Sequence, residues 1–174
     1  MLPVAKRAFL AGLAALILGL AAHPAPLLAQ GTLVSIGSGG HDTGQPVEIT
    51  ADEFRLDQTA GTATFLGNVL VIQGDMRLSA ATLTAEYSDG ADGRRIERLL
   101  ASGGVTVVAG NETAEAAEAV HEVDSGSLRM QGDVMLTQGP AFITGDALTV
   151  DLRSGSGTMS GRVRTLFQPR AGTP

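Results

Sequence analysis

The chain has 174 residues and a formal net charge of −6, and 44% of its residues are hydrophobic but only 3% are aromatic. It has no Cys and three His, which excludes a disulfide scaffold, a thiolate metal site and a Cys nucleophile. The apolar residues are mainly Val, Leu, Ile and Ala, interspersed with 23 Gly, and this mixture favours short strands and tight turns over a helical bundle. The composition therefore indicates an all-β protein and speaks against most classes of enzyme.

Residues 1–29 have the layout of a secretory signal peptide. Lys6 and Arg7 form a basic start, residues 8–22 form an apolar run, and Ala29 supplies a small residue before the expected cleavage site. The alternative is an uncleaved membrane anchor, but the apolar run is shorter than the ~20 residues that a membrane-spanning helix needs. We therefore expect cleavage after Ala29 and export of the remainder from the cytoplasm.

Cleavage changes the charge balance. It removes Lys6 and Arg7, which leaves 10 Arg against 18 Asp and Glu. Nucleic-acid binding and attachment to anionic membrane surfaces both depend on clusters of basic side chains. The acidic remainder therefore excludes nucleic acid as a partner.

Composition divides the rest of the chain into three parts. Residues 30–45 are rich in Gly, Ser and Thr, which predicts a flexible leader. Apolar alternation runs through residues 46–168, which we expect to form one folded domain. Pro169 ends the last expected strand, and residues 169–174 are expected to be a short tail.

A G-x-V element recurs four times in the expected domain, which indicates a repeat architecture. The copies begin at Gly67, Gly103, Gly132 and Gly161, at spacings of 36, 29 and 29 residues. The first spacing is longer because a turn-rich insertion, residues 88–94, separates the first two copies. The domain therefore consists of repeats of about 29 residues.

Within each repeat, apolar residues occupy alternate positions, which predicts strands with one buried and one solvated face. One set of columns comprises Phe54, Leu56, Leu83, Ala85, Tyr87, Ala119, His121, Val123, Leu148, Val150 and Leu152, and a companion set comprises Phe65, Val69, Val71, Val105, Val107, Met130, Val134, Leu136 and Val163. Strands that each expose one apolar face must stack these faces together. We therefore expect a filled solenoid or two sheets that enclose an apolar groove.

Residues 112–122 present a conflict between two rules. The segment is rich in Ala and Glu, and its intrinsic propensity favours a helix. The repeat register instead predicts a strand, with Glu112 and Ala114 in the phase of Met76 and Leu78. We expect the strand, because tertiary context overrides propensity.

Several motifs, taken in register, resemble the LptA/OstA family of periplasmic lipopolysaccharide-transport proteins. They span residues 46–52, 61–75, 78–83, 96–105 and 132–139, and the resemblance covers roughly residues 46–167. It implies an OstA-like β-jellyroll, a twisted, V-shaped stack of short antiparallel strands. It favours the LptA type over LptC, which keeps its membrane anchor, and over LptD, which carries a C-terminal barrel.

The resemblance also implies a function without catalysis, cofactor or metal. The jellyroll would bind lipopolysaccharide by shielding the acyl chains of lipid A. It would assemble head to tail and bridge an LptC-like jellyroll at the inner membrane and an LptD-like jellyroll at the outer membrane. The residues expected to line the groove are Val47, Ile49, Phe65, Tyr87, His121 and Val123 by resemblance, and Leu56, Val71, Val107, Leu136, Val150 and Leu152 by alternation.

Two further expectations concern single features. His121 lies alone in an apolar column without a ligand at metal spacing, so we expect a buried histidine or a polar lining contact. The two ends of the repeat are open strand edges, which pair readily with other chains. The residues expected at the assembly edges are Val47, Glu48 and Ile49 at one end and Val163, Arg164 and Thr165 at the other.

Three alternatives stay open at this point. Each expected lining residue can also be a core residue that contacts no ligand. A carbohydrate-active β-helix enzyme would need paired carboxylates in a cleft, and the outward acids are not distinguishable from a solubilising surface. A β-solenoid scaffold that polymerises without ligand fits the same repeat.

Overall fold

A computed structural model describes residues 32–35, 42, 44–90 and 93–168. The expected signal peptide, residues 1–29, and the expected tail, residues 169–174, lie outside the described residues. All described elements are strands, and every pairing between them is antiparallel. In the part of the chain that the structure describes, no helix has the length and hydropathy to cross a membrane. The expected all-β antiparallel fold is confirmed.

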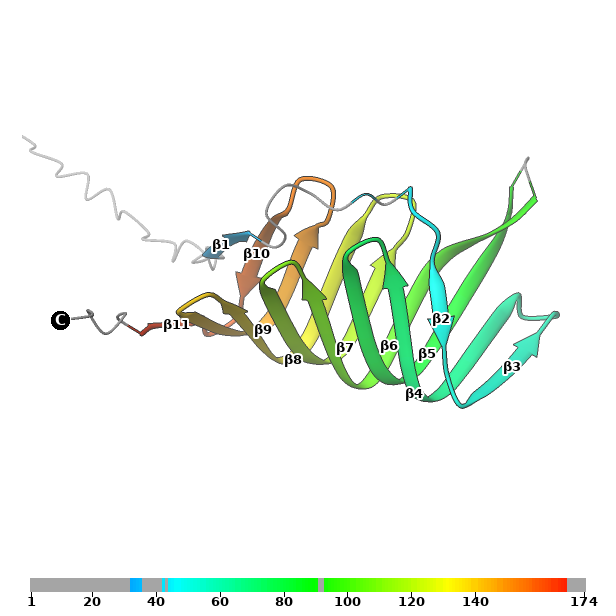
Figure 1. Cartoon of the computed structure of the whole chain (residues 1–174), viewed down its shortest axis with the longest axis horizontal. Helices are drawn as coiled ribbons and strands as arrows, with labels where there is room; N and C mark the ends of the chain where they lie inside the picture. The colour runs from blue at the N-terminus through cyan, green and yellow to red at the C-terminus, as the bar shows by residue number, and fades with distance from the viewer. Residues whose placement is uncertain (1–31, 36–41, 43, 91–92, 169–174) are drawn as a thin grey trace, which may run out of the picture.

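The strands stack side by side along the long axis of the molecule (Figure 1). They are β1 (Thr32–Ser35), β2 (Glu48–Thr50), β3 (Glu53–Asp57), β4 (Thr62–Gln73), β5 (Met76–Gly90), β6 (Gly93–Ala109), β7 (Glu112–Glu122), β8 (Ser127–Gln138), β9 (Ala141–Asp151), β10 (Ser156–Ser160) and β11 (Arg164–Phe167). The sheet order is β1-β10-β9-β8-β7-β6-β5-β4-β2, with β11 also pairing with β9 and β3 with β4.

Each long strand is interrupted near its middle by a shift of register, and these shifts form a line across the sheet. The line, which we call the bend, divides the sheet into two arms. Arm A comprises residues 48–50, 69–73, 76–80, 105–109, 112–116, 134–138, 141–145 and 164–167. Arm B comprises residues 32–35, 53–57, 62–66, 82–90, 93–102, 118–122, 127–131, 147–151 and 156–160.

The G-x-V elements form the bend, and their backbone angles explain why glycine begins each one. Both the Gly and the following residue have positive φ in all four copies: 76° and 45° at Gly67, 84° and 84° at Gly103, 84° and 49° at Gly132, and 75° and 40° at Gly161. Two consecutive residues in this region turn the strand sharply, and glycine adopts the region without a steric penalty. The repeat seen in the sequence is therefore the repeat of the bend.

The inner faces of the two arms form one hydrophobic core. One row of residues in register crosses the whole of arm A and another crosses the whole of arm B. Row A is Ile49, Val71, Leu78, Val107, Ala114, Leu136, Ile143 and Thr165. Row B is Leu56, Ala63, Ala85, Leu99, His121, Leu128, Val150, Gly157 and Val34. The predicted alternation is confirmed in both arms.

The conflict over residues 112–122 is resolved in favour of the strand. β7 spans Glu112–Glu122, and Ala114 lies in row A with Leu78. Its small alanines at positions 114, 116 and 119 are buried, whereas Glu115 and Glu118 are exposed. The long-range ladder therefore outweighs the local helix propensity.

Two segments differ in detail from the expected layout. Of the expected insertion, residues 88–94, the described residues 88–90 and 93–94 extend the strands of the β5–β6 hairpin, in which Tyr87 pairs with Ile96. These two strands project beyond their neighbours (Figure 1). Within the expected leader, residues 32–35 form β1 and pair with β10. The limits of the domain, residues 46–168, stay a prediction.

Candidate functional site

The candidate site is the apolar interior between the two arms. Six of the expected lining residues are buried in it, and five are half-buried and pack against the core. The buried residues are Val71, Val107, His121, Leu136, Val150 and Leu152, and the half-buried residues are Val47, Ile49, Phe65, Tyr87 and Val123. Leu56 differs, because half of its surface is exposed at the end of arm B.

The inward-facing side chains are less covered at the end of the molecule formed by β2 and β3. Phe54 and Leu56 on β3 are 57% and 50% exposed, although both belong to rows that are buried further along arm B. The rings of Phe54 and Phe65 contact each other with centroids 5.2 Å apart. The guanidinium of Arg94 lies 5.4 Å from the ring centroid of Tyr87, a cation–π contact. We call this half-open end, lined by Ile49, Phe54, Leu56, Phe65 and Tyr87, the apolar mouth.

The opposite end also exposes large apolar residues. Leu166 and Phe167 on β11 are 58% and 71% exposed, and Leu33 on β1 is exposed as well. Leu33 and Leu166 pair with Thr158 and Phe142 and lie on the outer face, whereas Phe167 shares the inner face with Ala141. Sequence reasoning did not place Phe167 in the site. Phe167 pairs with Ala141, which is buried, so the alternation of the last strand was the signal that could have identified it.

The expected assembly edges lie at these same two ends. Glu48 and Ile49 belong to β2, and Arg164 and Thr165 belong to β11. Val163 is half-buried against the core, just after the bend at Gly161. The expected edges are therefore terminal strands of arm A.

His121 occupies a central position in row B. It is buried between Leu99 of β6 and Leu128 of β8, and its side chain faces the interior. In the described ranges, no group of three His, Cys, Asp or Glu side chains has the geometry of a metal site. The imidazole of His121 is therefore a polar group within an otherwise apolar row.

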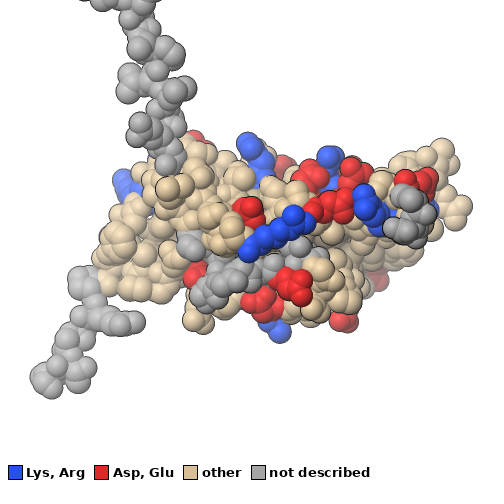
Figure 2. All heavy atoms as spheres, turned by 90° about the horizontal axis from the view of Figure 1, so that it is seen from above, with Lys and Arg blue, Asp and Glu red and all other residues tan. Residues whose placement is uncertain are grey.

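The outer surface carries interspersed acidic and basic side chains (Figure 2). Arg98 bridges two neighbouring strands, with Nη1 3.1 Å from Glu86 Oε2 and Nε 2.8 Å from Glu122 Oε1. The hydrogen bond to Glu122 raises the pKa of Arg98 above its ordinary value. Arg95 pairs with Asp124 at 2.9 Å. These guanidinium groups are therefore committed to carboxylates of the same chain.

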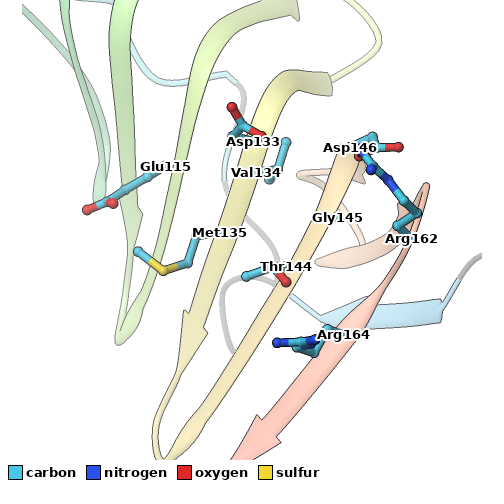
Figure 3. A pocket seen from close by; sticks show the side chains of 9 residues that line it. All are labelled: Glu115, Asp133, Val134, Met135, Thr144, Gly145, Asp146, Arg162 and Arg164. Carbon is cyan, nitrogen blue, oxygen red and sulfur yellow. The ribbon is translucent and has the colours of Figure 1, made fainter.

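A separate depression of about 530 Å³ lies on the outer side of the bend (Figure 3). Its charged lining residues are Glu115, Asp133, Asp146, Arg162 and Arg164. Arg162 Nη2 lies 3.3 Å from Asp146 Oδ1, so part of this charge is neutralised within the depression. The exposed, mixed-charge lining contrasts with the apolar interior between the arms.

The fold and the site together define a β-jellyroll whose two arms enclose an apolar core. The family model described as LptA/(LptD N-terminal domain) LPS transport protein matches residues 48–156. The chain therefore belongs to this family of lipopolysaccharide-transport proteins, and the resemblance seen in the sequence is confirmed.

Three known proteins illustrate what the chain is similar to. An uncharacterized protein of Rhizobium meliloti (strain 1021) is 26% identical over 178 residues, which cover 97% of this chain and 96% of that protein. The lipopolysaccharide export system protein LptA of Escherichia coli K12 is 34% identical over 55 residues, which span 32% of this chain and 30% of that protein. The solved structures include LptH of Pseudomonas aeruginosa, an LptA homologue and the periplasmic component of a lipopolysaccharide transport device. Its crystal structure superposes on this chain with a TM-score of 0.64 at 19% sequence identity, and the match covers 74% of this chain and 99% of that one.

Proposed function

We propose that the protein is a periplasmic transport protein that binds lipopolysaccharide and holds the acyl chains of lipid A between its two arms. The observation that carries this proposal is the apolar core between the arms, with Phe54 and Leu56 exposed at one end of its inner face and Phe167 exposed at the other. The names of the Escherichia coli and Pseudomonas aeruginosa relatives, a lipopolysaccharide export protein and a periplasmic component, support it. The predicted signal peptide supports the same compartment.

Binding requires the arms to separate, because row A and row B are closely packed in this structure. Val71 and Leu136 are at most 1% exposed, whereas Ile49, Phe65 and Tyr87 at the mouth are half-buried. Separation therefore begins at the mouth. Each CH₂ of an acyl chain that moves from water into the interior contributes about 0.8 kcal/mol, so a chain of ordinary length offsets the loss of some packing.

Lipid A phosphates contribute less to this binding than acyl burial does. The chain is acidic, and Arg95 and Arg98 near the projecting hairpin already pair with Asp124, Glu86 and Glu122. Exposed ion pairs contribute little free energy, and a phosphate would have to compete with carboxylates that are already in place. The affinity for lipopolysaccharide thus depends mainly on the burial of its acyl chains.

The terminal strands support head-to-tail bridging between LptC-like and LptD-like jellyrolls. Gln168 N–H donates to Pro140 O at 2.9 Å, in register with the β11–β9 ladder. Since backbone bonds alternate along an antiparallel strand, the N–H of Thr165 points away from β9 toward the open edge. β11 and β2 run in opposite directions along arm A, so β2 of a second copy continues the antiparallel ladder.

A photo-crosslinking experiment in living cells tests the lipid path. A photoreactive residue at Ile49 or Phe65, which face the interior, is expected to capture lipopolysaccharide. The same residue at Glu48 or Arg129, which are exposed on the outside, is the matched control and is expected to capture none. Equal capture at all four positions would refute the assignment of the interior.

The close packing of the interior favours a second candidate, a structural scaffold that polymerises without ligand. Protein purified from its native periplasm distinguishes the two candidates. Mass spectrometry of an organic extract is expected to detect glycolipid in stoichiometric amount. An extract free of lipid, together with assembly of the protein, would favour the scaffold.

A further inference from the structure

β1 fits into a specific site at the end of arm B. It pairs with β10 over four positions, and its Val34 is 8% exposed whereas its Leu33 is 83% exposed. One side chain of this strand is therefore inserted in the core while its neighbour lies in solvent. β1 is docked by Val34 rather than merely lying along the edge.

The site for Val34 exists because β10 has a glycine in row B. Every strand from β3 to β9 that crosses row B contributes a side chain there, but β10 contributes Gly157. A Cβ built at Gly157 would lie 3.1 Å from Val34 Cγ2 and 3.2 Å from Val150 Cγ2. Val34 thus occupies the space that a side chain on β10 would fill. We call this space the Gly157 notch.

At the opposite end of row B, Leu56 has no neighbouring strand to cover it, in contrast to Val34 in the Gly157 notch. The row begins with Leu56 on β3, which is half exposed, and it ends with Val34 in the Gly157 notch. β3 runs antiparallel to β4, and β1 runs antiparallel to β10, so both strands run from the bend toward the tip of arm B. Placed against β10 in the orientation of β1, a β3 strand would present Leu56 where Val34 now lies.

We infer that β1 is an intramolecular competitor for the β10 edge, and that the occupant it displaces is β3 of a second copy of this chain, with Leu56 entering the Gly157 notch. This inference rests on the head-to-tail assembly proposed above and adds a regulatory element to it. While β1 is docked, the edge of arm B at this end is β1 itself, which runs in the same direction as β3 and so cannot continue the antiparallel ladder with it. Release of β1 opens the matching edge of arm B, so that both arms continue into the next copy.

The first test compares Val34→Asp with Leu33→Asp in the mature chain. The two variants place the same charge on the same strand, one in the Gly157 notch and one in solvent. Loss of Val34 burial is expected to release β1 and to tighten self-association at least about tenfold, measured as the apparent dissociation constant by sedimentation velocity. Leu33→Asp is expected to associate like the wild type, and circular dichroism verifies that both variants are folded.

The second test locks β1 in place. The native chain has no Cys. A Leu33→Cys/Thr158→Cys double variant therefore creates one pair, at directly opposite positions of β1 and β10, within disulfide reach. The oxidised, intramolecularly linked form is expected to associate at least about tenfold more weakly than the same protein after reduction.

The outcomes separate this inference from the proposed assembly. If the wild type and Val34→Asp associate equally, or the locked form associates as well as the reduced form, assembly stands and the role of β1 is refuted. If the cysteines link different chains, β1 is exchanged between copies and does not act as an internal competitor. If no variant associates at any concentration, head-to-tail assembly itself is refuted, together with this inference.

Discussion

The bend can be tested with two adjacent glycines that share the same backbone angle. Gly103 and Gly104 both have φ of +84°, but a Cβ at Gly103 would lie 2.7 Å from Ala81 Cβ, whereas a Cβ at Gly104 would have no heavy atom within 4 Å. Replacing either glycine by alanine costs about 1–2 kcal/mol for the left-handed backbone. The contact with Ala81 adds about 1–3 kcal/mol at Gly103 alone, because two carbon atoms cannot approach so closely.

We therefore expect Gly104→Ala to lower the free energy of unfolding by about 1–2 kcal/mol and Gly103→Ala to lower it by about 2–5 kcal/mol. Urea unfolding followed by far-ultraviolet circular dichroism measures both, since the chain has no Trp for fluorescence. Adding Ala81→Gly to Gly103→Ala is expected to restore the steric part, because it removes the opposing methyl group. Equal destabilisation by the two single variants, or no recovery in the double variant, would show that the bend is not closely packed on its outer side.

Two further predictions concern the edge and the turns. Thr165→Pro removes a backbone donor that points to the open edge, so we expect light scattering to show loss of self-association in a folded protein. The control variant Leu166→Pro breaks the ladder to β9 and unfolds β11. Unchanged association of Thr165→Pro would exclude this edge from the joint. Backbone hydrogen bonds from Ser154 and Arg153 hold the pKa of Asp151 below its ordinary 3.8. Because the pKa of Asp151 is lowered in the folded state, the ionised carboxylate stabilises the fold above pH 3.8, and this stabilisation is lost as the pH falls through the lower folded value. Asp151→Asn is therefore expected to flatten part of the decline in melting temperature at acid pH. An unchanged pH profile of the melting temperature would contradict this effect.

The repeat could be predicted from the sequence because its signals are local. The bend needs two consecutive residues at positive φ, so glycine recurs at Gly67, Gly103, Gly132 and Gly161 and sets the register of every strand between. Once this register was known, even the helix-favouring residues 112–122 could be assigned to a strand. The rows of the core then followed from alternation.

The remaining features depend on residues far apart in the chain. β1 forms because Val34 fills a space beside Gly157, and no local signal in residues 32–35 indicates that partner. Leu56 was expected to line the interior, but it lies on the last strand of arm B, where its row has no further neighbour to cover it. Alternation gives the direction of a side chain but not how much of it the next strand covers.

The order of the strands along the long axis also determines how the protein responds to tension. A pull along this axis acts on the hydrogen bonds between neighbouring strands, because these bonds point in the stacking direction (Figure 1). β6 and β7 share ten paired positions, whereas β2 and β4 share three and β11 and β9 share four. The terminal strands therefore detach at the lowest force, and the central stack stays intact. In the head-to-tail assembly proposed above, a fibre of such units would break and re-form at its joints, and the apolar core of each unit would be preserved through each break.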